Sequence, residues 1–496
     1  MMYVRMIGVM LINLYASRLV LQILGVSDYG TYNVVGGFVT MFAFLDVSIS
    51  NAAQRYISIG LGSGNKELTK HYFEQSFTIL LLIAILTAVV CELVGTWYIG
   101  NKLVVPSDRL NAAFWVFHFS VVSVICTIIR VVFLANIIAR EELNAFAYIS
   151  ILEAISRWLI LYILLVIGGD NLIWYAFWVM IISISCLALY AIYCKLRYPE
   201  CSFRIVFDRV LIKELSSFIG LTTFGGFSHT VSNQGINLIL NFFFGPIVNA
   251  ARGISVQVSS LIGKLNTSIS VPVRPVIVKA YANNNIDDIE KLIYKSSKFT
   301  FCLIAIVSFT LIVEMEYVLQ IWLGQVPPYT VNFCRLAICN EMVLALVAPL
   351  SSTANATGKI LKFELYGRMI TLSSLPLSYA CLLYSKNPYI PVIMIVICNL
   401  LYWTYCLFDI VNQLELSIMS YYRSVIIPCL ALLLMIGGIS YGLISILPLN
   451  HLASSSIILV ANTLVGLLVL YIFSSHQERD YYRNVLAGIY RKVKKQ

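Results

Sequence analysis

The chain has 496 residues, of which 59% are hydrophobic and 12% are charged, whereas about a quarter of the residues in a soluble globular domain are charged. This composition excludes a water-soluble globular enzyme. Apolar runs of about 18 or more residues recur along the whole chain with short polar gaps, which is the pattern of membrane-spanning helices. The sequence therefore predicts an all-α polytopic membrane protein.

Fourteen apolar segments fit a helix that crosses the hydrocarbon core, which needs about 20 residues. We predict helices over 3–24, 30–60, 76–99, 112–138, 144–167, 171–194, 217–243, 248–273, 297–322, 330–356, 363–384, 389–411, 424–447 and 454–474. The first segment lacks a small-residue cleavage site before Ser27 and Asp28, so we expect a permanent span and not a signal peptide.

The distribution of Lys and Arg predicts the orientation, because short basic loops stay on the cytoplasmic side. With the N-terminus inside, 24 of the 34 basic residues lie in cytoplasmic loops and tails, and only Lys102, Arg109 and Lys386 face outside. We therefore expect both termini in the cytoplasm. These loops also explain the net charge of +10, so no nucleic-acid partner is expected.

The two halves of the chain repeat with an offset of 220 residues. Gly25 and Gly245 each close the turn between the first and second helices of a half, and Asn65 in the next cytoplasmic loop corresponds to Asn285. An even number of helices in each half gives a parallel repeat, in which both halves enter the membrane in the same direction. The predicted organisation is an N-lobe of helices 1 to 6 (1–195), a cytoplasmic linker (196–216), a C-lobe of helices 7 to 12 (217–411), helices 13 and 14 (412–474) and a basic cytoplasmic tail (475–496).

The sequence lacks the motifs of ATP hydrolysis, disulfide pairing and metal binding. No Gly-x-x-x-x-Gly-Lys-Ser/Thr segment is present, so we expect no ATPase site in this chain. The 12 cysteines stand singly in apolar runs without a Cys-x-x-Cys pair, and none of the five histidines has metal-ligand spacing. We expect core cysteines, no metal site and no cofactor.

Basic residues inside the predicted spans are candidates for a polar cavity, because charges are costly in the membrane interior and usually face a bundle interior or water. Four belong to the first two helices of the two halves, which would line the gap between the lobes: Arg18, Arg55, Arg252 and Lys264. Lys264 is the deepest. For Arg18, Arg55 and Arg252, a side chain that reaches the membrane surface remains an alternative.

An asparagine stripe marks the predicted helix over 217–243. Asn233, Asn237 and Asn241 have i, i+4, i+8 spacing, with Gln234 adjacent, so they share one face of the helix. We interpret this face as a water-lined, substrate-binding surface; hydrogen bonding between helices is the alternative.

The predicted spans also contain three further arginines and six acidic residues. Arg157 follows Glu153 by four residues, which predicts an ion pair within the helix, and Arg130 and Arg335 are interpreted as structural or interfacial. Any intramembrane acid is a candidate for binding a proton or cation, and the sequence does not select among them: Asp46, Glu92, Glu153, Glu314, Glu316 and Glu341.

Three blocks of residues resemble Wzx-type O-antigen flippases, and the similarity covers nearly the whole chain. The first runs from Ser17-Arg18 through Leu24-Gly25-Val26-Ser27-Asp28-Tyr29-Gly30 to Gly36-Gly37 and then Gln54-Arg55-Tyr56. The second is Gln234-Gly235-Ile236-Asn237 with Phe244-Gly245-Pro246 and Asn249-Ala250-Ala251-Arg252-Gly253, and the third is Ala356-Thr357-Gly358-Lys359-Ile360.

The resemblance implies a member of the superfamily of two-lobed exporters that includes multidrug extruders and the lipid II flippase. It implies alternating access, which moves undecaprenyl-pyrophosphate-linked oligosaccharides of O-antigen or capsule across a bacterial inner membrane. It further implies a non-enzymatic transporter driven by protons, sodium ions or the membrane potential, in contact with the lipid bilayer and with the polysaccharide polymerase machinery as a candidate partner. A monomer is expected. Arg18, Arg55 and Arg252 match basic cavity positions of the lipid II flippase in general placement.

Two other functions fit the sequence less well. A multidrug or cation exporter of the same superfamily needs an acidic cavity in its first lobe, whereas the first helix offers Arg18 and no acid. A polysaccharide polymerase or ligase needs a sizeable external loop, whereas the longest one predicted here spans only 100–111.

Overall fold

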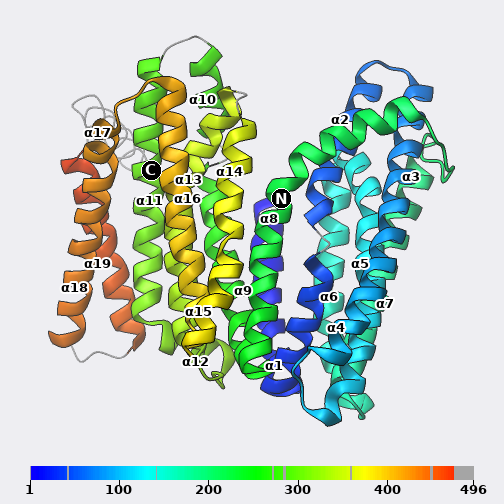
Figure 1. The fold of residues 1–496 in the computed structure, drawn as a ribbon, viewed down its shortest axis with the longest axis horizontal. Coiled ribbons are helices and arrows are strands. Elements are labelled where there is room, and N and C mark those ends of the chain that lie inside the picture. The colour runs from blue at the N-terminus through cyan, green and yellow to red at the C-terminus, as the bar shows by residue number, and fades with distance from the viewer. Residues whose placement is uncertain are drawn as a thin grey trace, which may run out of the picture. The chain divides into compact units, whose positions relative to one another are not determined.

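The computed structural model of the chain describes residues 2–41, 44–140, 142–270, 273–282, 286–357, 360–446 and 451–473. All regular elements among these residues are helices (Figure 1). The predicted basic tail, Asn285 and Lys359 lie outside the described residues.

Within the described residues, the first half of the chain forms seven α-helices. They are α1 (Met2–Thr40), α2 (Phe44–Gly62), α3 (Lys66–Val90), α4 (Thr96–Asn101), α5 (Leu110–Ala139), α6 (Leu143–Ile167) and α7 (Asn171–Arg197). A π-helical turn, Cys91–Gly95, joins α3 to α4, and a short 3-10 helix, Ser107–Arg109, precedes α5.

The other twelve α-helices that the structure describes belong to the second half, and several of them are short. They are α8 (Arg209–Phe244), α9 (Pro246–Ser270), α10 (Val273–Ala282), α11 (Ile286–Val313), α12 (Met315–Leu323), α13 (Thr330–Thr357), α14 (Ile360–Leu372), α15 (Ser374–Tyr384), α16 (Ile390–Leu414), α17 (Ile418–Tyr421), α18 (Ile427–Ile446) and α19 (His451–Ile472). A second π-helical turn, Tyr422–Ile426, lies between α17 and α18.

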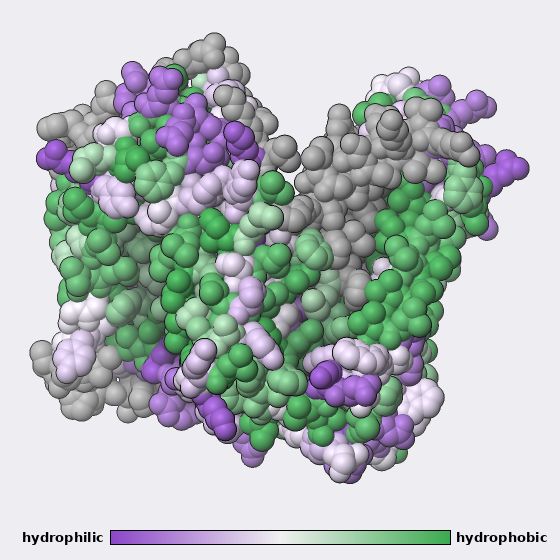
Figure 2. Space-filling model, in the orientation of Figure 1, coloured by the Kyte–Doolittle hydropathy of each residue, from purple (hydrophilic) through white to green (hydrophobic). Residues whose placement is uncertain are grey.

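This architecture confirms the predicted all-α membrane fold. Each of the fourteen predicted ranges corresponds to one or more helices, and nine helices within the described part of the chain are long and apolar enough to cross a membrane. On the face shown in Figure 2, hydrophobic side chains cover the middle of each part of the molecule and hydrophilic ones gather towards the ends. That distribution fits a bilayer around the middle and water at both ends.

Several predicted helix ends were wrong by about ten residues. The third helix was expected at 76, yet α3 begins at Lys66, where the side chain of Asn65 accepts a hydrogen bond from the Leu68 amide at 3.1 Å. Such a cap starts a helix among polar residues. Hydropathy detects only the segment inside the hydrocarbon, so it misses a helix that continues into water.

The internal repeat is visible in the helix ends. Gly25 and Gly245 have φ of 76° and 75°, a left-handed conformation that favours glycine, and each separates two helical segments. The helices that follow begin at equivalent positions as well: α3 and α11 begin at residues 66 and 286, and α5 and α13 begin at residues 110 and 330. The predicted lobe boundaries stay a prediction.

The chain forms two compact units, which are described separately below. Unit 1 consists of Met1–Ile254, Leu319–Thr330 and Glu364–Met394, and unit 2 of Ser255–Val318, Val331–Phe363 and Ile395–Gln496. In unit 1, α5 packs against α2, α3 and α7, around the fully buried Phe117 and Phe133.

In unit 2, α18 and α19 pack on α11 and on each other. Polar side chains reinforce this packing: Asn462 of α19 donates to Thr310 of α11 at 3.1 Å and accepts from Ser440 of α18 at 3.2 Å. The last two helices are therefore an integral part of unit 2. The cysteines, all of which lie in the described residues, are core residues as expected, because ten of the 12 are buried and none forms a disulfide bond.

Candidate functional site

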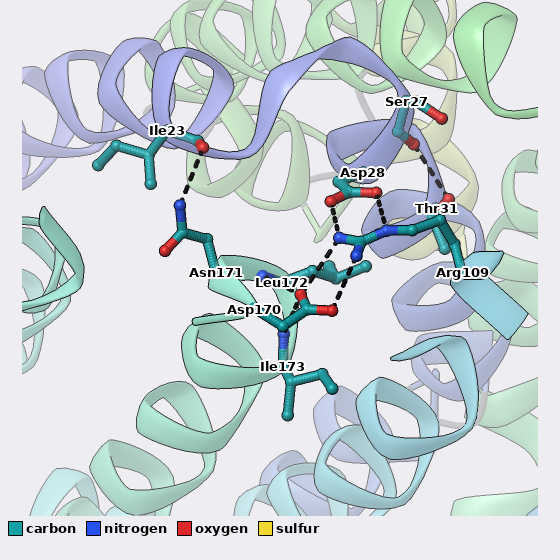
Figure 3. Close-up of polar contacts among 9 residues, drawn as sticks. All are labelled: Ile23, Ser27, Asp28, Thr31, Arg109, Asp170, Asn171, Leu172 and Ile173. Atoms are coloured by element: carbon teal, nitrogen blue, oxygen red, sulfur yellow. Dashed lines mark hydrogen bonds and ion pairs between the residues drawn. The ribbon is translucent and has the colours of Figure 1, made fainter. Parts of the chain in front are cut away.

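The break at Gly25 is held by an ion cluster at the end of the N-terminal helices (Figure 3). The Arg109 guanidinium lies between two carboxylates: its Nε donates to Asp28 at 2.8 Å and its Nη1 to Asp170 at 2.8 Å. Asp170 also caps α7, accepting from the Leu172 amide at 3.0 Å. A bidentate guanidinium is a rigid link, so Arg109 fixes the direction of the second part of α1, which carries the contacts described next.

Two glycines allow this part of α1 to lie directly against α9. A Cβ added to Gly30 would lie 1.8 Å from the carbonyl oxygen of Pro246, and one added to Gly253 would lie 2.8 Å from the amide group of Asn33. Asn33 and Gly253 are themselves separated by the repeat offset of 220 residues. The two helices therefore meet at equivalent positions of the repeat.

A row of polar side chains runs beside this contact, and we call it the polar seam: Thr40, Asn233, Gln234, Asn237 and Arg252. Asn237 donates to Gln234 at 2.6 Å, and Gln234 donates to Thr40 of α1 at 3.3 Å. Arg252 of α9 donates to Asn233 of α8 at 3.2 Å and is only 4% exposed. The structure thus brings three predicted site residues, Asn233, Asn237 and Arg252, to the region where α1, α8 and α9 meet.

Asn241, the third residue of the predicted stripe, is placed differently. It is fully buried, its side-chain oxygen accepts from the Val104 amide at 2.9 Å, and its side-chain nitrogen donates to the Val104 carbonyl at 3.1 Å. Both ends of the amide are therefore occupied by backbone. In this structure Asn241 therefore lies one turn beyond the polar seam, and its role in a water-lined, substrate-binding face stays a prediction.

Arg18 caps another helix. It donates to the carbonyl of Ile321 in the last turn of α12 at 3.1 Å, and the neighbouring Trp322 donates to the carbonyl of Leu14 at 2.7 Å. A positive charge at a helix C-terminus is favourable because the last carbonyl groups have no partner within the helix. Arg18 therefore links α1 to α12 within unit 1.

The two remaining predicted cations are Arg55 and Lys264. Arg55 lies in α2, but its side chain is outside the described residues. Lys264 lies in α9, is exposed and belongs to unit 2. The substrate-binding roles of Arg18, Arg55, Arg252 and Lys264 remain predictions.

A second charged cluster lies among the N-terminal helices. Arg157 pairs with Glu153 at 3.1 Å, as the helical spacing predicted, and Arg130 of α5 pairs with the same carboxylate at 2.9 Å. The context of Arg130 was missed because its partner is on another helix. Two guanidinium groups share one carboxylate, so the cluster keeps a net positive charge.

Comparisons with known proteins reveal similarity in structure and not in sequence. No protein-family model matches the chain, and no curated protein matches its sequence. Among solved structures, the lipid II flippase MurJ in an inward closed conformation aligns with a TM-score of 0.68 and 14% identity, over 97% of this chain and 99% of that one. A multidrug resistance MATE family transporter of the MOP superfamily, inward-facing, aligns with a TM-score of 0.68 and 12% identity, over 82% of this chain and 94% of that one.

These similarities extend over most or all of each chain, and they agree with the repeat and with the helix order described above. At such low identity they establish the fold and leave the substrate open. The chain is therefore a polytopic membrane protein with the fold shared by MATE transporters and the lipid II flippase MurJ.

Proposed function

We propose that this chain is a flippase that moves undecaprenyl-pyrophosphate-linked oligosaccharide repeat units, of O-antigen or capsule, from the cytoplasmic to the outer leaflet by alternating access. The observation that carries the proposal is Arg252, a cation held among neutral hydrogen-bonding groups in the polar seam. A diphosphate-linked sugar presents the complementary chemistry: an anionic headgroup followed by hydroxyl groups.

The chemistry of the seam suits that headgroup. Arginine binds phosphate oxygens through parallel N–H donors, and the amides of Asn233, Gln234 and Asn237 offer donors and acceptors for sugars. Because Arg252 is 4% exposed, the substrate-binding conformation requires α1 to move away from α9. The predicted role of Asn241 in this surface requires Val104 to release its amide.

The fold is shared with a lipid II flippase over nearly the whole chain. The alignment with the lipid II flippase covers 97% of this chain, and the alignment with the multidrug transporter covers 82%. We propose an inner-membrane location with both termini cytoplasmic, a cycle driven by protons, sodium ions or the membrane potential, and the polysaccharide polymerase machinery as a candidate partner. The proposed protein is a monomeric transporter and not an enzyme.

A multidrug exporter of the same superfamily is the second candidate, and the same fold favours it equally. Against it, the polar seam carries a cation and none of its five members is an acid. A cationic drug would meet repulsion from Arg252 and would leave the seam without a counter-charge.

The test is a leaflet assay in bacteria deleted for their own flippase. We express the parent chain and its Arg18→Ala, Arg252→Ala and Lys264→Ala variants, and measure delivery of lipid-linked repeat units to the outer leaflet. Arg204→Ala is the control, because Arg204 is an exposed residue of the linker. The proposal predicts delivery by the parent and the control, and at least about tenfold slower delivery by Arg252→Ala, the loss expected for one charged hydrogen bond.

Two results would contradict the proposal in different ways. Failure of the parent in several repeat-unit backgrounds would contradict the flippase function. Delivery by the parent and by all three variants at equal rates would contradict a role for these cations in holding the headgroup.

A further inference from the structure

An acidic side chain lies deep in a membrane-spanning helix of unit 2. Glu341 is in α13, a 28-residue candidate span, about 17 Å from the nearer end by the rise of an α-helix. It is only 9% exposed. Acids at this depth are rare and usually functional, because an ionised carboxylate is unfavourable away from water.

The partners of Glu341 are neutral. Its Oε1 accepts a hydrogen bond from the Ser259 hydroxyl of α9 at 2.6 Å. Its Oε2 faces Gly263 one turn further along α9, where an added Cβ would lie 3.2 Å away. The neighbouring Asn340 accepts from Asn399 of α16 at 2.6 Å. The carboxyl group therefore lies between packed helices, in contact with a hydroxyl and with helix backbone.

The charged groups on the surrounding helices are directed elsewhere. Arg335 of α13 donates to the Ile312 carbonyl at 3.0 Å, Asp409 of α16 accepts from Gln413 at 2.8 Å, and Lys264 of α9 is exposed. Among the described residues, no cation is within the 4.0 Å of an ion pair with Glu341.

The other intramembrane acids with described partners have different surroundings. Glu153 is neutralised by two arginines, Glu92 is 42% exposed and pairs with His118 at 3.0 Å, and Glu314 lies between α11 and α12 at a helix end. Among these described acids, Glu341 combines a position deep in a span with neutral partners, and such surroundings favour the uncharged form.

We propose that Glu341 is the proton carrier that couples transport to the proton gradient, a role that rests on the proposed function. A proton from water binds the carboxylate, and the resulting carboxyl group is compatible with α9 packed on α13 through Ser259. Release of that proton to water on the other side leaves a carboxylate that needs hydration, so the ionised form favours a conformation in which α9 and α13 separate. Proton occupancy thereby shifts the population between two conformations.

Infrared spectroscopy of the purified full-length chain in lipid nanodiscs tests the protonation directly, without any substrate. The parent should show a protonated-carboxyl band that disappears in Glu341→Gln and shifts in Ser259→Ala, which removes the hydrogen bond. Glu316→Gln is the matched control, since Glu316 is an exposed acid in the first turn of α12. Identical bands in the parent and in Glu341→Gln would overturn the proposal. So would loss of the band on addition of sodium at constant pH, because that result indicates a cation site.

The leaflet assay then tests coupling. Glu341→Gln, at equal membrane levels, should deliver repeat units at least about tenfold more slowly and should lose the parent's response to collapse of the proton gradient. Glu341→Asp, which retains a titratable carboxyl, should recover part of the rate. A Glu341→Gln variant that delivers at the parental rate, and still responds to the proton gradient, would overturn the coupling role.

The two proposals fail separately. If the parent delivers no lipid-linked repeat unit but the Glu341 band is present and titrates with pH, the flippase function fails and the proton site stands. If the parent delivers but the band is absent, the flippase function stands and the proton site fails.

Discussion

Gly30→Ala is expected to separate α1 from α9 and to impair transport. The added Cβ would lie 1.8 Å from the Pro246 carbonyl oxygen, and Cβ atoms essentially never approach another atom within 3.0 Å, so the helices must part by about 1.2 Å. Overpacking against backbone destabilises by about 1–3 kcal/mol. The better helix propensity of alanine offsets about 1 kcal/mol of this loss.

Gly36→Ala on the same helix is the matched control, because a Cβ added there would meet no atom of another helix within 4 Å. It should be neutral or more stable by up to about 1 kcal/mol. The two variants should therefore differ by about 2 kcal/mol in unfolding free energy. Thermal unfolding of the purified chains measures the difference, and the leaflet assay should show reduced delivery only for Gly30→Ala. Equal stability and equal delivery would refute the close contact between α1 and α9.

Four other substitutions or titrations test the structure independently. Asn241→Ala leaves the backbone of Val104 without its partners and should destabilise by about 1–3 kcal/mol, measured by thermal unfolding; no change would contradict its burial. Glu153→Gln leaves two arginines without their carboxylate and should destabilise by up to about 3 kcal/mol; a more stable variant would show that the cluster is not paired. Arg109→Lys keeps the charge but loses the bidentate geometry, so the unfolding temperature should fall, and an unchanged value would contradict the bridge in Figure 3. Hydrogen bonds from tyrosine hydroxyls lower the pKa of Glu142 below its usual 4.5. The ionised carboxylate therefore stabilises the fold fully at neutral pH, and this stabilisation is lost as the pH falls through the lowered pKa. The difference in unfolding free energy between the parent and Glu142→Gln should disappear in acid, and a difference that does not change with pH would contradict the role of these hydrogen bonds.

The spans and the repeat were predictable because they depend on local sequence. Apolar runs indicate membrane helices whatever their neighbours, the two left-handed glycines interrupt helices through their own backbone preference, and the Glu153–Arg157 pair follows from helical spacing. Helix ends in water were mispredicted, since Asn65 starts α3 by a polar cap that hydropathy does not detect.

The long-range partners were not predictable from one sequence. Arg109 contacts Asp28 across 81 residues and Arg18 contacts Ile321 across 303 residues, and periodicity contains no information about such pairs. The asparagine stripe shows the same limit: its spacing correctly placed three amides on one helix face, but only packing determines that Asn241 meets backbone while Asn233 meets Arg252.

Reconstitution tests the central claim most directly. The purified chain is placed in vesicles without ATP and given either an undecaprenyl-pyrophosphate-linked oligosaccharide or a cationic dye, under an imposed proton gradient. The account predicts that the parent moves the lipid-linked oligosaccharide between leaflets, that Arg252→Gln moves it at least about tenfold more slowly, and that neither moves the dye. Transport of the dye, with no movement of the oligosaccharide, would contradict the account and favour a multidrug exporter.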